Sequence, residues 1–431
     1  MPTAPAGGKD AATGDKPGAA TNSVLSLSDL EAIAVESNPS LVQLAFVVEK
    51  ARGIHEQVGL YPNPVVGYSA NEIGNEGAAG QQGGFIAQTI VTADKLRLNR
   101  DVASWNVQEL SWEYQAQRYR ILNDVRLRYY DVLGAQQRLK IAGELLKVAE
   151  NGVKIAEQLR KAKQASRADV LQATVDLNQI QIIRQNAKYD YQAAWKRLVA
   201  VLGRPEIRPA TLAGSLKGAA ADWQWGPTYQ KLVDESPQIQ AARSRIQGAR
   251  LAIQRQEAQP IPNLLTQAGV QFDNSTGDTI TSVQIGIPLP IYNRNQGIVR
   301  LARAEYQRAV RDAERLELQL RDRLATAFRD FQQAKFQVQQ YQKNILSNAQ
   351  ESRKLTEESY RAGQVNFLRV LTARRTYFEA NLLYVDALIA LRQANVVIDG
   401  FVLTGGLTDV PNIGSRVLKS IGQRGQALGG Q

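Results

Sequence analysis

The 431-residue chain contains no cysteine, one methionine and one histidine, His55. Without cysteine it can form no disulfide bond, no thiol nucleophile and no thiolate metal cluster. A Ser-His-Asp triad would have to use His55, and a zinc site needs several such ligands, so His55 is expected to be a surface or interhelix residue. We therefore expect no enzyme activity, no metal site and no cofactor.

Long hydrophobic runs are also absent. The sequence has no stretch of about 18 apolar residues and no secretory hydrophobic segment, so it predicts no membrane-spanning helix and shows no signal peptide. Residues 1–24, with much glycine, alanine and proline, are expected to form a flexible leader. An export signal, if the protein has one, is not visible in this chain.

Basic residues outnumber acidic ones, with 52 Lys and Arg against 41 Asp and Glu and a formal net charge of +11. This balance is compatible with nucleic acid or an anionic membrane surface as a partner. The charges are spread through segments rich in Arg, Gln and Glu, which is typical of solvated helix faces. Basic and aromatic residues between Arg118 and Tyr130 fall on both faces of a helix, so we expect no nucleic-acid partner.

Proline is missing from two long stretches, between Pro64 and Pro205 and between Pro290 and Pro411. Because an interior proline costs a helix about 3 kcal/mol, these stretches are where long helices can form. Both carry apolar residues about 3.5 positions apart, the spacing of coiled-coil packing.

The apolar periodicity is lost at one point in each stretch, near 161–167 and at 362–364. Each stretch is therefore predicted to fold into a helical hairpin with its turn at that point. The first helix, from about Lys95 to Lys161, would be roughly 100 Å long. No ordinary globular domain needs a helix of that length.

The two halves of the chain repeat each other. Pro62-Asn63-Pro64 is matched by Pro260-Ile261-Pro262, and Val170 to Ala173 is matched by Val370 to Ala373. The matched motifs are about 200 residues apart, so the sequence predicts a tandem duplication of a unit of that size.

Two short segments of period 2 precede the long helices of each half. Their alternating apolar residues, segment by segment, are Val66, Tyr68 and Ala70; Phe85, Ala87 and Val91; Leu264, Thr266, Ala268, Val270 and Phe272; and Val283, Ile285, Ile287 and Leu289. Such alternation predicts β-hairpins whose strands are long enough for tilted membrane strands. Four strands cannot close a barrel, so in a membrane several chains would have to pool them; the alternative is two soluble hairpins that cap a coiled coil.

Short motifs in both halves carry a family resemblance. They are Asn38-Pro39-Ser40-Leu41, Gly59 to Pro64, Asp169 to Ala173, Gln284 to Pro290, and Ala362-Gly363 with Val370 to Ala373. From about Leu25 to Gly405 the chain resembles the TolC-like outer-membrane efflux proteins, and the segment from Tyr61 to Glu72 is most similar to their divalent-metal efflux branch.

The resemblance implies a mainly α fold with a membrane β-barrel portion. Three chains would form a twelve-stranded barrel in outer-membrane lipid and a twelve-helix tunnel across the periplasm. This homotrimer would dock on a periplasmic adaptor protein and an inner-membrane efflux pump, which supplies the energy.

The expected organisation follows the duplication. After the leader come a first repeat, 25–203, with its β-hairpin at 63–92 and helical hairpin at 95–203; an equatorial linker, 204–225; a second repeat, 226–404, with its β-hairpin at 262–290 and helical hairpin at 297–404; and a flexible tail, 405–431.

The resemblance also makes the two helical turns the adaptor-facing tips and the narrowest part of the pore. The candidate site residues there are Arg160, Lys161, Lys163, Arg167, Asp169, Gly363, Asn366, Arg369 and Thr372. Relatives carry an acidic ring just after the second turn, where this chain has Arg369 and Thr372. We hypothesise a more basic pore end, closed by pairing of Asp169 with Arg369 between neighbouring turns; alternatively these are merely solvated tip residues.

Two functions remain open at this point. The first is a passive export duct for metal cations or small organic toxicants; because the chain has almost no soft ligand, a metal would pass without specific coordination. The second is a structural or adhesive coiled-coil protein of the cell envelope without channel activity.

Overall fold

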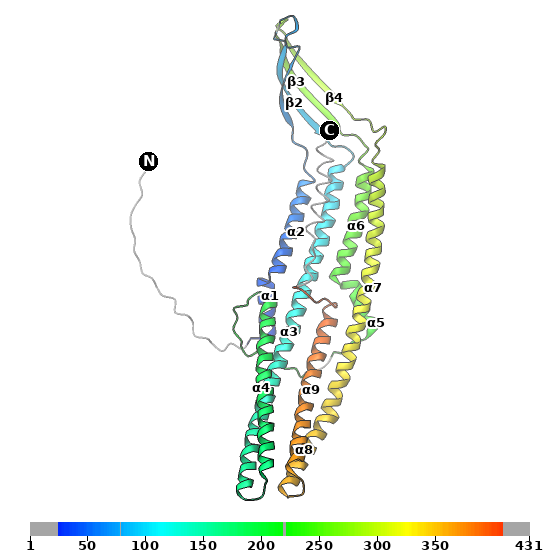
Figure 1. Ribbon diagram of the computed structural model, residues 1–431. Helices are drawn as coiled ribbons and strands as arrows, with labels where there is room; N and C mark the ends of the chain where they lie inside the picture. Colours follow the sequence, from blue (N-terminus) through cyan, green and yellow to red (C-terminus); the bar gives the residue numbers. More distant parts are fainter. Residues whose placement is uncertain (1–24, 78, 219–220, 408–431) are drawn as a thin grey trace, which may run out of the picture.

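The computed structural model describes residues 25–77, 79–218 and 221–407 (Figure 1). The leader expected at 1–24 and the tail residues after 407 lie outside these ranges. The described part is a long rod with a small sheet at one end and the turns of two helical hairpins at the other (Figure 1).

The first half contains, in chain order, the helices Leu27–Ser37 (α1) and Pro39–Gln57 (α2), strand Val65–Asn71 (β1), the short 3-10 helix Asn75–Gly77 (η1), strand Gln81–Ile90 (β2) and the helices Lys95–Lys161 (α3) and Arg167–Leu202 (α4). The second half contains Trp225–Glu235 (α5), Pro237–Glu257 (α6), strands Leu264–Asp273 (β3) and Thr279–Gly286 (β4), Gln296–Gln340 (α7), the π-helical segment Tyr341–Ile345 (η2), Leu346–Arg361 (α8) and Phe367–Asp399 (α9). Both halves therefore run helix pair, β-hairpin and helical hairpin, as the duplication predicts.

The long second-half helix is not α-helical throughout. The sequence shows one apolar stripe through this region, but the structure inserts a π-helical segment between α7 and α8. A π turn adds a residue to the helical turn without removing apolar residues from the stripe, so periodicity alone does not reveal it.

The four strands form one antiparallel sheet in the order β1-β2-β3-β4. Directly opposite residues in an antiparallel pair lie on the same face. Val66 faces Ile86, Ile86 faces Ala268, and Ala268 faces Val283, so these four residues form one apolar row across the sheet.

The alternating residues Phe85 and Ala87 of β2 lie on the face opposite to this row. Phe85 lies opposite Gly67 and Gly269, on the other side of the sheet from Val66 and Ile86. A β-carbon on Gly67 would lie 2.4 Å from the Phe85 ring, so the ring covers the space that this glycine leaves. The residue of β2 in the apolar row is therefore Ile86, and Phe85 packs over a glycine on the opposite face.

Two buried apolar clusters hold the helices of the two halves together. In the first, Trp195 of α4 and Val125 of α3 pack with Val385 of α9. In the second, Phe331 of α7 packs with Leu391 of α9 and with part of α3. Since α3 and α9 each belong to both clusters, these two helices join the repeats.

Among the described helices only α9 is long and apolar enough to cross a membrane, with a mean hydropathy of 1.2 in its most apolar window. The sequence analysis expected no such helix. Half of that window is buried inside the protein, and Asp386 of α9 forms an ion pair with Arg138 of α3. We therefore assign α9 to the helical core.

The sequence analysis expected a flexible tail from residue 405, but Gly405 and Gly406 are hydrogen-bonded to α3. The backbone N–H groups of Gly405 and Gly406 donate to the Asp124 carboxylate at 3.1 and 2.7 Å. The Asn123 side chain of α3 donates to the carbonyls of Gly400 and Leu403 at 2.9 and 2.7 Å. These bonds fasten the end of the second repeat to the first.

The linker packs against the middle of the helices. Leu212 forms a parallel bridge with Leu25, and the Trp195 indole N–H donates to the carbonyl of Ile207 at 3.0 Å. The hydroxyl of Tyr191 donates to the carbonyl of Ala210 at 3.0 Å. The linker is thereby held across α4 by side chains of that helix.

Candidate functional site at the helical turns

The two helical turns have the same backbone geometry. In each, an N–H bonds back five residues, from Gln164 to Leu159 at 2.8 Å and from Gln364 to Ser359 at 2.9 Å. The residue before it adopts a left-handed conformation, with φ of +57° at Lys163 and +74° at Gly363. Glycine reaches this conformation without penalty, whereas a side chain there costs roughly 1–2 kcal/mol, so the first turn is the more strained of the two.

Capping side chains begin the helix after each turn. The Ser166 backbone N–H and hydroxyl both donate to the Asp169 carboxylate at 2.8 Å, and the Asp169 N–H donates back to the Ser166 hydroxyl at 3.1 Å. These bonds hold the pKa of Asp169 below its ordinary value. In the second turn the Asn366 side chain accepts from the Arg369 N–H at 3.1 Å. Each cap fixes where its helix starts.

An apolar cluster joins the two turns into one tip. Buried Ala156, Ala173 and Phe367 come from α3, α4 and α9. Tyr360 of α8 packs on Phe367 with ring centroids 5.7 Å apart. Burial is the larger cause that raises the pKa of Tyr360, and the negative charge of Asp169 is the second. The Tyr360 phenol therefore lies close enough to Asp169, in the other helical hairpin, to be affected by its charge. The tip is therefore a single packed unit within one chain.

The structure places the nine candidate residues on this tip. Asp169 is half-buried and the other eight are exposed: Arg160, Lys161, Lys163, Arg167, Gly363, Asn366, Arg369 and Thr372. Within the described ranges, none of the five basic side chains forms an ion pair. Asp169 and Arg369 form no ion pair within the chain, and the Oδ2 atom of Asp169 accepts both bonds from Ser166.

The sequence analysis missed a polar layer above the tip. The Glu357 carboxylate of α8 accepts from Arg374 of α9 at 2.9 Å and from Arg353 at 3.4 Å. The Arg353 guanidinium also lies 5.0 Å from the centre of the Tyr377 ring. Arg353 and Glu357 are four residues apart on one helix face, which is the only sequence signal for this layer.

Asp176 of α4 belongs to the same layer. Burial raises its pKa, while the positive charges of Arg374 and Arg375 oppose that rise. Because the folded pKa exceeds the unfolded one, the contribution of Asp176 to stability increases as pH falls through the folded pKa. At neutral pH the buried negative charge is therefore a net cost to the tip.

Asp176→Asn should accordingly raise the melting temperature at pH 7 and lose that advantage near pH 4. Thermal unfolding of the detergent-solubilised protein at both pH values checks this. Asp190→Asn, an exposed change on the same helix, serves as control and should change neither value. A lower melting temperature of Asp176→Asn at pH 7 would show that its attraction to Arg374 outweighs its burial.

The tip offers packing and charge instead of reactive groups. Across residues 25–77, 79–218 and 221–407 no three His, Cys, Asp or Glu side chains come together in a way that could hold a metal ion. The tip can therefore position helices and present a basic surface, and it can act on a partner or an ion through its shape and its charge.

Comparison with known proteins agrees with the fold. Residues 32–204 and 228–400 match the family model "Outer membrane efflux protein", once for each repeat. The cobalt-zinc-cadmium resistance protein CzcC of Cupriavidus metallidurans is 26% identical over 271 residues, which cover 63% of this chain and 65% of CzcC. The probable efflux pump outer membrane protein SepC of Pseudomonas putida is 25% identical over 82% of this chain and 78% of its own length.

Solved channels share the architecture. The chain matches CusC with a TM-score of 0.74 at 19% identity, over 88% of this chain and 92% of CusC. It matches the outer-membrane channel OprN with a TM-score of 0.73 at 19% identity, over 89% and 91% of the two chains. Since the family model covers both repeats, the chain belongs to the outer membrane efflux protein family.

Proposed function

We propose that this chain is the passive outer-membrane export duct of a tripartite efflux system, formed by three copies. The observation that carries the proposal is the open sheet: β1 and β4 are its edge strands, and neither has a second neighbour in the described part of the chain. In lipid each unpaired backbone group costs several kcal/mol, so the edges need partners. Three copies of four strands would close a twelve-stranded barrel.

The two faces of the sheet support this barrel. The row Val66, Ile86, Ala268 and Val283 is apolar, and Val66 and Val283 are 78% and 73% exposed in the single chain. The opposite face carries Gly67, Phe85, Gly269 and Ser282 in one row, and Val65, Ala87, Gln267 and Gln284 in another. This face is therefore mixed, and its polar residues lie mainly on β3 and β4. A membrane channel requires an apolar exterior and an interior that carries polar side chains.

The helices supply the periplasmic length. α3 has 67 residues, which corresponds to roughly 100 Å of helix. Each of the three chains would contribute four lines of helix, and the twelve lines together would form a tunnel that continues the barrel. The tip would then face the adaptor protein, and the inner-membrane pump would supply the energy.

Engineered cysteines test the trimer directly, because the chain has no cysteine of its own. Paired cysteines scanned along β1 and β4 should give, at matching register, a covalent species of three chains on a non-reducing denaturing gel. Cysteines placed in β2 and β3, which already pair within the chain, are the control and should give monomers only. Products of two chains at every position would rule out the closed ring.

The basic tip is proposed to set ion preference at the narrow end of the duct. Arg369 is exposed and unpaired within the described residues, and its backbone N–H donates to the side chain of Asn366, the N-cap of α9. Arg369→Asp reverses one charge in each of three chains, so single-channel recordings should show greater cation preference. Lys188→Asp, an exposed change on α4 outside the tip, is the control. Unchanged selectivity in Arg369→Asp would remove this residue from the gate.

Divalent metal cations are the substrate we propose. CzcC is named for cobalt, zinc and cadmium resistance, whereas TtgF of Pseudomonas putida, 25% identical over 391 residues, is named for toluene efflux. Cells that carry the cognate pump and adaptor should accumulate more Co²⁺, Zn²⁺ or Cd²⁺ when this chain is deleted. Accumulation of an organic toxicant with unchanged metal content would assign the duct to that second class.

A further inference from the structure

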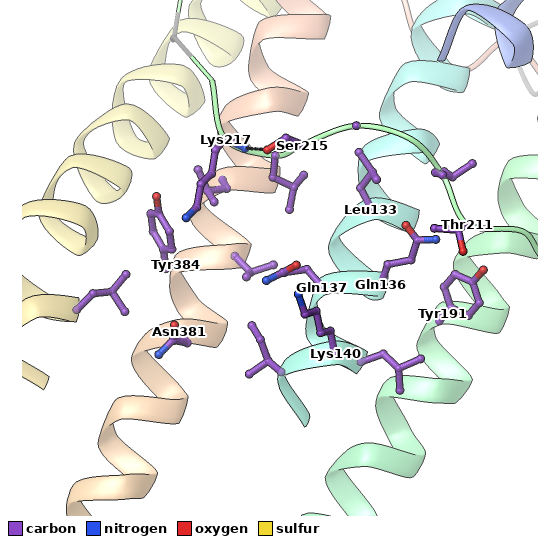
Figure 2. A pocket seen from close by; sticks show the side chains of 18 residues that line it. Leu133, Gln136, Gln137, Lys140, Tyr191, Thr211, Ser215, Lys217, Asn381 and Tyr384 are labelled. Atoms are coloured by element: carbon purple, nitrogen blue, oxygen red, sulfur yellow. Dashed lines mark hydrogen bonds between the residues drawn. The ribbon is translucent and has the colours of Figure 1, made fainter. Parts of the chain in front are cut away.

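A cavity of about 780 Å³ lies between the two helical hairpins (Figure 2). Its walls come from α3, α4, α9 and the start of α8, and linker residues 211–217 cross over it. A volume of this size is within the range of small-molecule sites. The helix segments that line the cavity lie in the helical part of the rod, away from the sheet (Figure 1).

One side of the cavity is apolar and fixed. Leu133, Val385 and Leu388 line it and also belong to the buried core between the halves. Leu212 and Leu216 reach it from the linker and are 4% and 8% exposed. Because these side chains are already packed on their other sides, they form a preformed apolar surface.

The polar lining includes side chains with structural partners and two lysines whose ammonium groups have none in the described ranges. Gln136, Tyr191 and Asn381 hydrogen-bond to backbone carbonyls and so have structural partners. By contrast, no hydrogen bond or ion pair within the described ranges uses the ammonium groups of Lys140 and Lys217.

Figure 2 shows Lys217 extending from the linker toward Tyr384 of α9, and Lys140 extending from α3 beside Gln137. No Asp or Glu lines the cavity. Two cations without a counter-charge beside an apolar wall are complementary to one kind of molecule, an anion with an apolar body.

We propose that this cavity binds a small amphiphilic anion, with its carboxylate or phosphate head between Lys140 and Lys217 and its apolar body against the leucine wall. The ligand is a soluble small molecule and not a bilayer lipid, because the helix segments that line the cavity lie far along the rod from the strands (Figure 1). The site uses no residue of the tip and does not depend on the export function.

Decanoate is a suitable probe, with decyltrimethylammonium as its cationic counterpart. Equilibrium dialysis of the purified full chain in nanodiscs of neutral lipid, corrected with empty nanodiscs, should show saturable binding of decanoate near one molecule per chain and none of the cation. Lys140→Gln with Lys217→Gln should weaken decanoate binding at least about tenfold, because two charge-assisted contacts are lost.

The matched control is Lys147→Gln with Lys188→Gln. It removes the same charge from exposed positions on α3 and α4 outside the cavity, and decanoate affinity should stay within about twofold of the parent. The proposal is overturned if decanoate shows no saturable binding, if the cation binds equally well, or if both double variants lose affinity alike.

Discussion

Val283→Arg should abolish insertion of the assembled protein into the outer membrane. Val283 is central in β4, 73% exposed, and continues the apolar row of Val66, Ile86 and Ala268. If this row faces lipid, an arginine near the middle of the bilayer costs about 2–4 kcal/mol in each chain, and a trimer meets that cost three times. Membrane fractionation with a native gel measures the loss of inserted trimer.

The neighbouring residue is the control. Gln284 follows Val283 in β4, so its side chain points to the other face, where it lies opposite Gln267. Gln284→Arg should insert like the parent and change only conductance or ion selectivity. Equal loss of trimer in both variants would mean that the two faces do not differ as proposed.

Gly83→Ala should disrupt the sheet, whereas Gly84→Ala should be tolerated. A β-carbon on Gly83 would lie 1.9 Å from the Val270 carbonyl oxygen and 2.5 Å from the Gln271 Cα, both backbone atoms of β3. Backbone cannot rotate away as a side chain can, so β2 and β3 must separate; overpacking of this kind costs about 1–3 kcal/mol or more in each chain.

At Gly84 the only atom within 4 Å of an added β-carbon is the Gly67 carbonyl oxygen, at 3.8 Å, an ordinary contact. The two variants differ by one position and have the same composition. The fraction of heat-resistant oligomer in detergent compares them. A Gly83→Ala protein as resistant as Gly84→Ala would show that the β2–β3 spacing can adjust.

Element type and order were predictable from the sequence for a physical reason. Proline-free stretches with an apolar stripe can hardly form anything but long helices, and α3 spans Lys95–Lys161 as expected. The loss of periodicity at 161–167 and 362–364 coincides with the two turns, because a left-handed residue must interrupt the stripe.

Features set by contacts between distant residues were not predictable. Which face of the sheet Phe85 and Ala87 occupy depends on the register of β2 against β1 and β3, and their alternation in the sequence does not determine it. The attachment of Gly405 and Gly406 depends on Asp124, about 280 residues away in sequence. A local pattern contains neither kind of information.

The candidate site also contains features that the sequence could predict and features that it could not. The turn residues could be chosen from the break in periodicity and the family resemblance, but their partners could not. The Asp169 carboxylate accepts hydrogen bonds from Ser166 at the helix cap. Glu357 forms ion pairs with Arg353 and Arg374 in a layer that no sequence motif indicates. Local capping is visible in sequence as Ser followed three residues later by an acid, whereas a layer built from three helices is not.

Single-channel recording in planar lipid bilayers tests the central proposal most directly. The purified full chain should insert as a trimer and give long-lived conductance steps, and an Arg369→Asp trimer should give steps of altered ion preference. Heat-dissociated monomers, with the open edges of β1 and β4, should give none. Intact trimers that bind the membrane and never conduct would contradict the duct and favour a structural role for the helical rod.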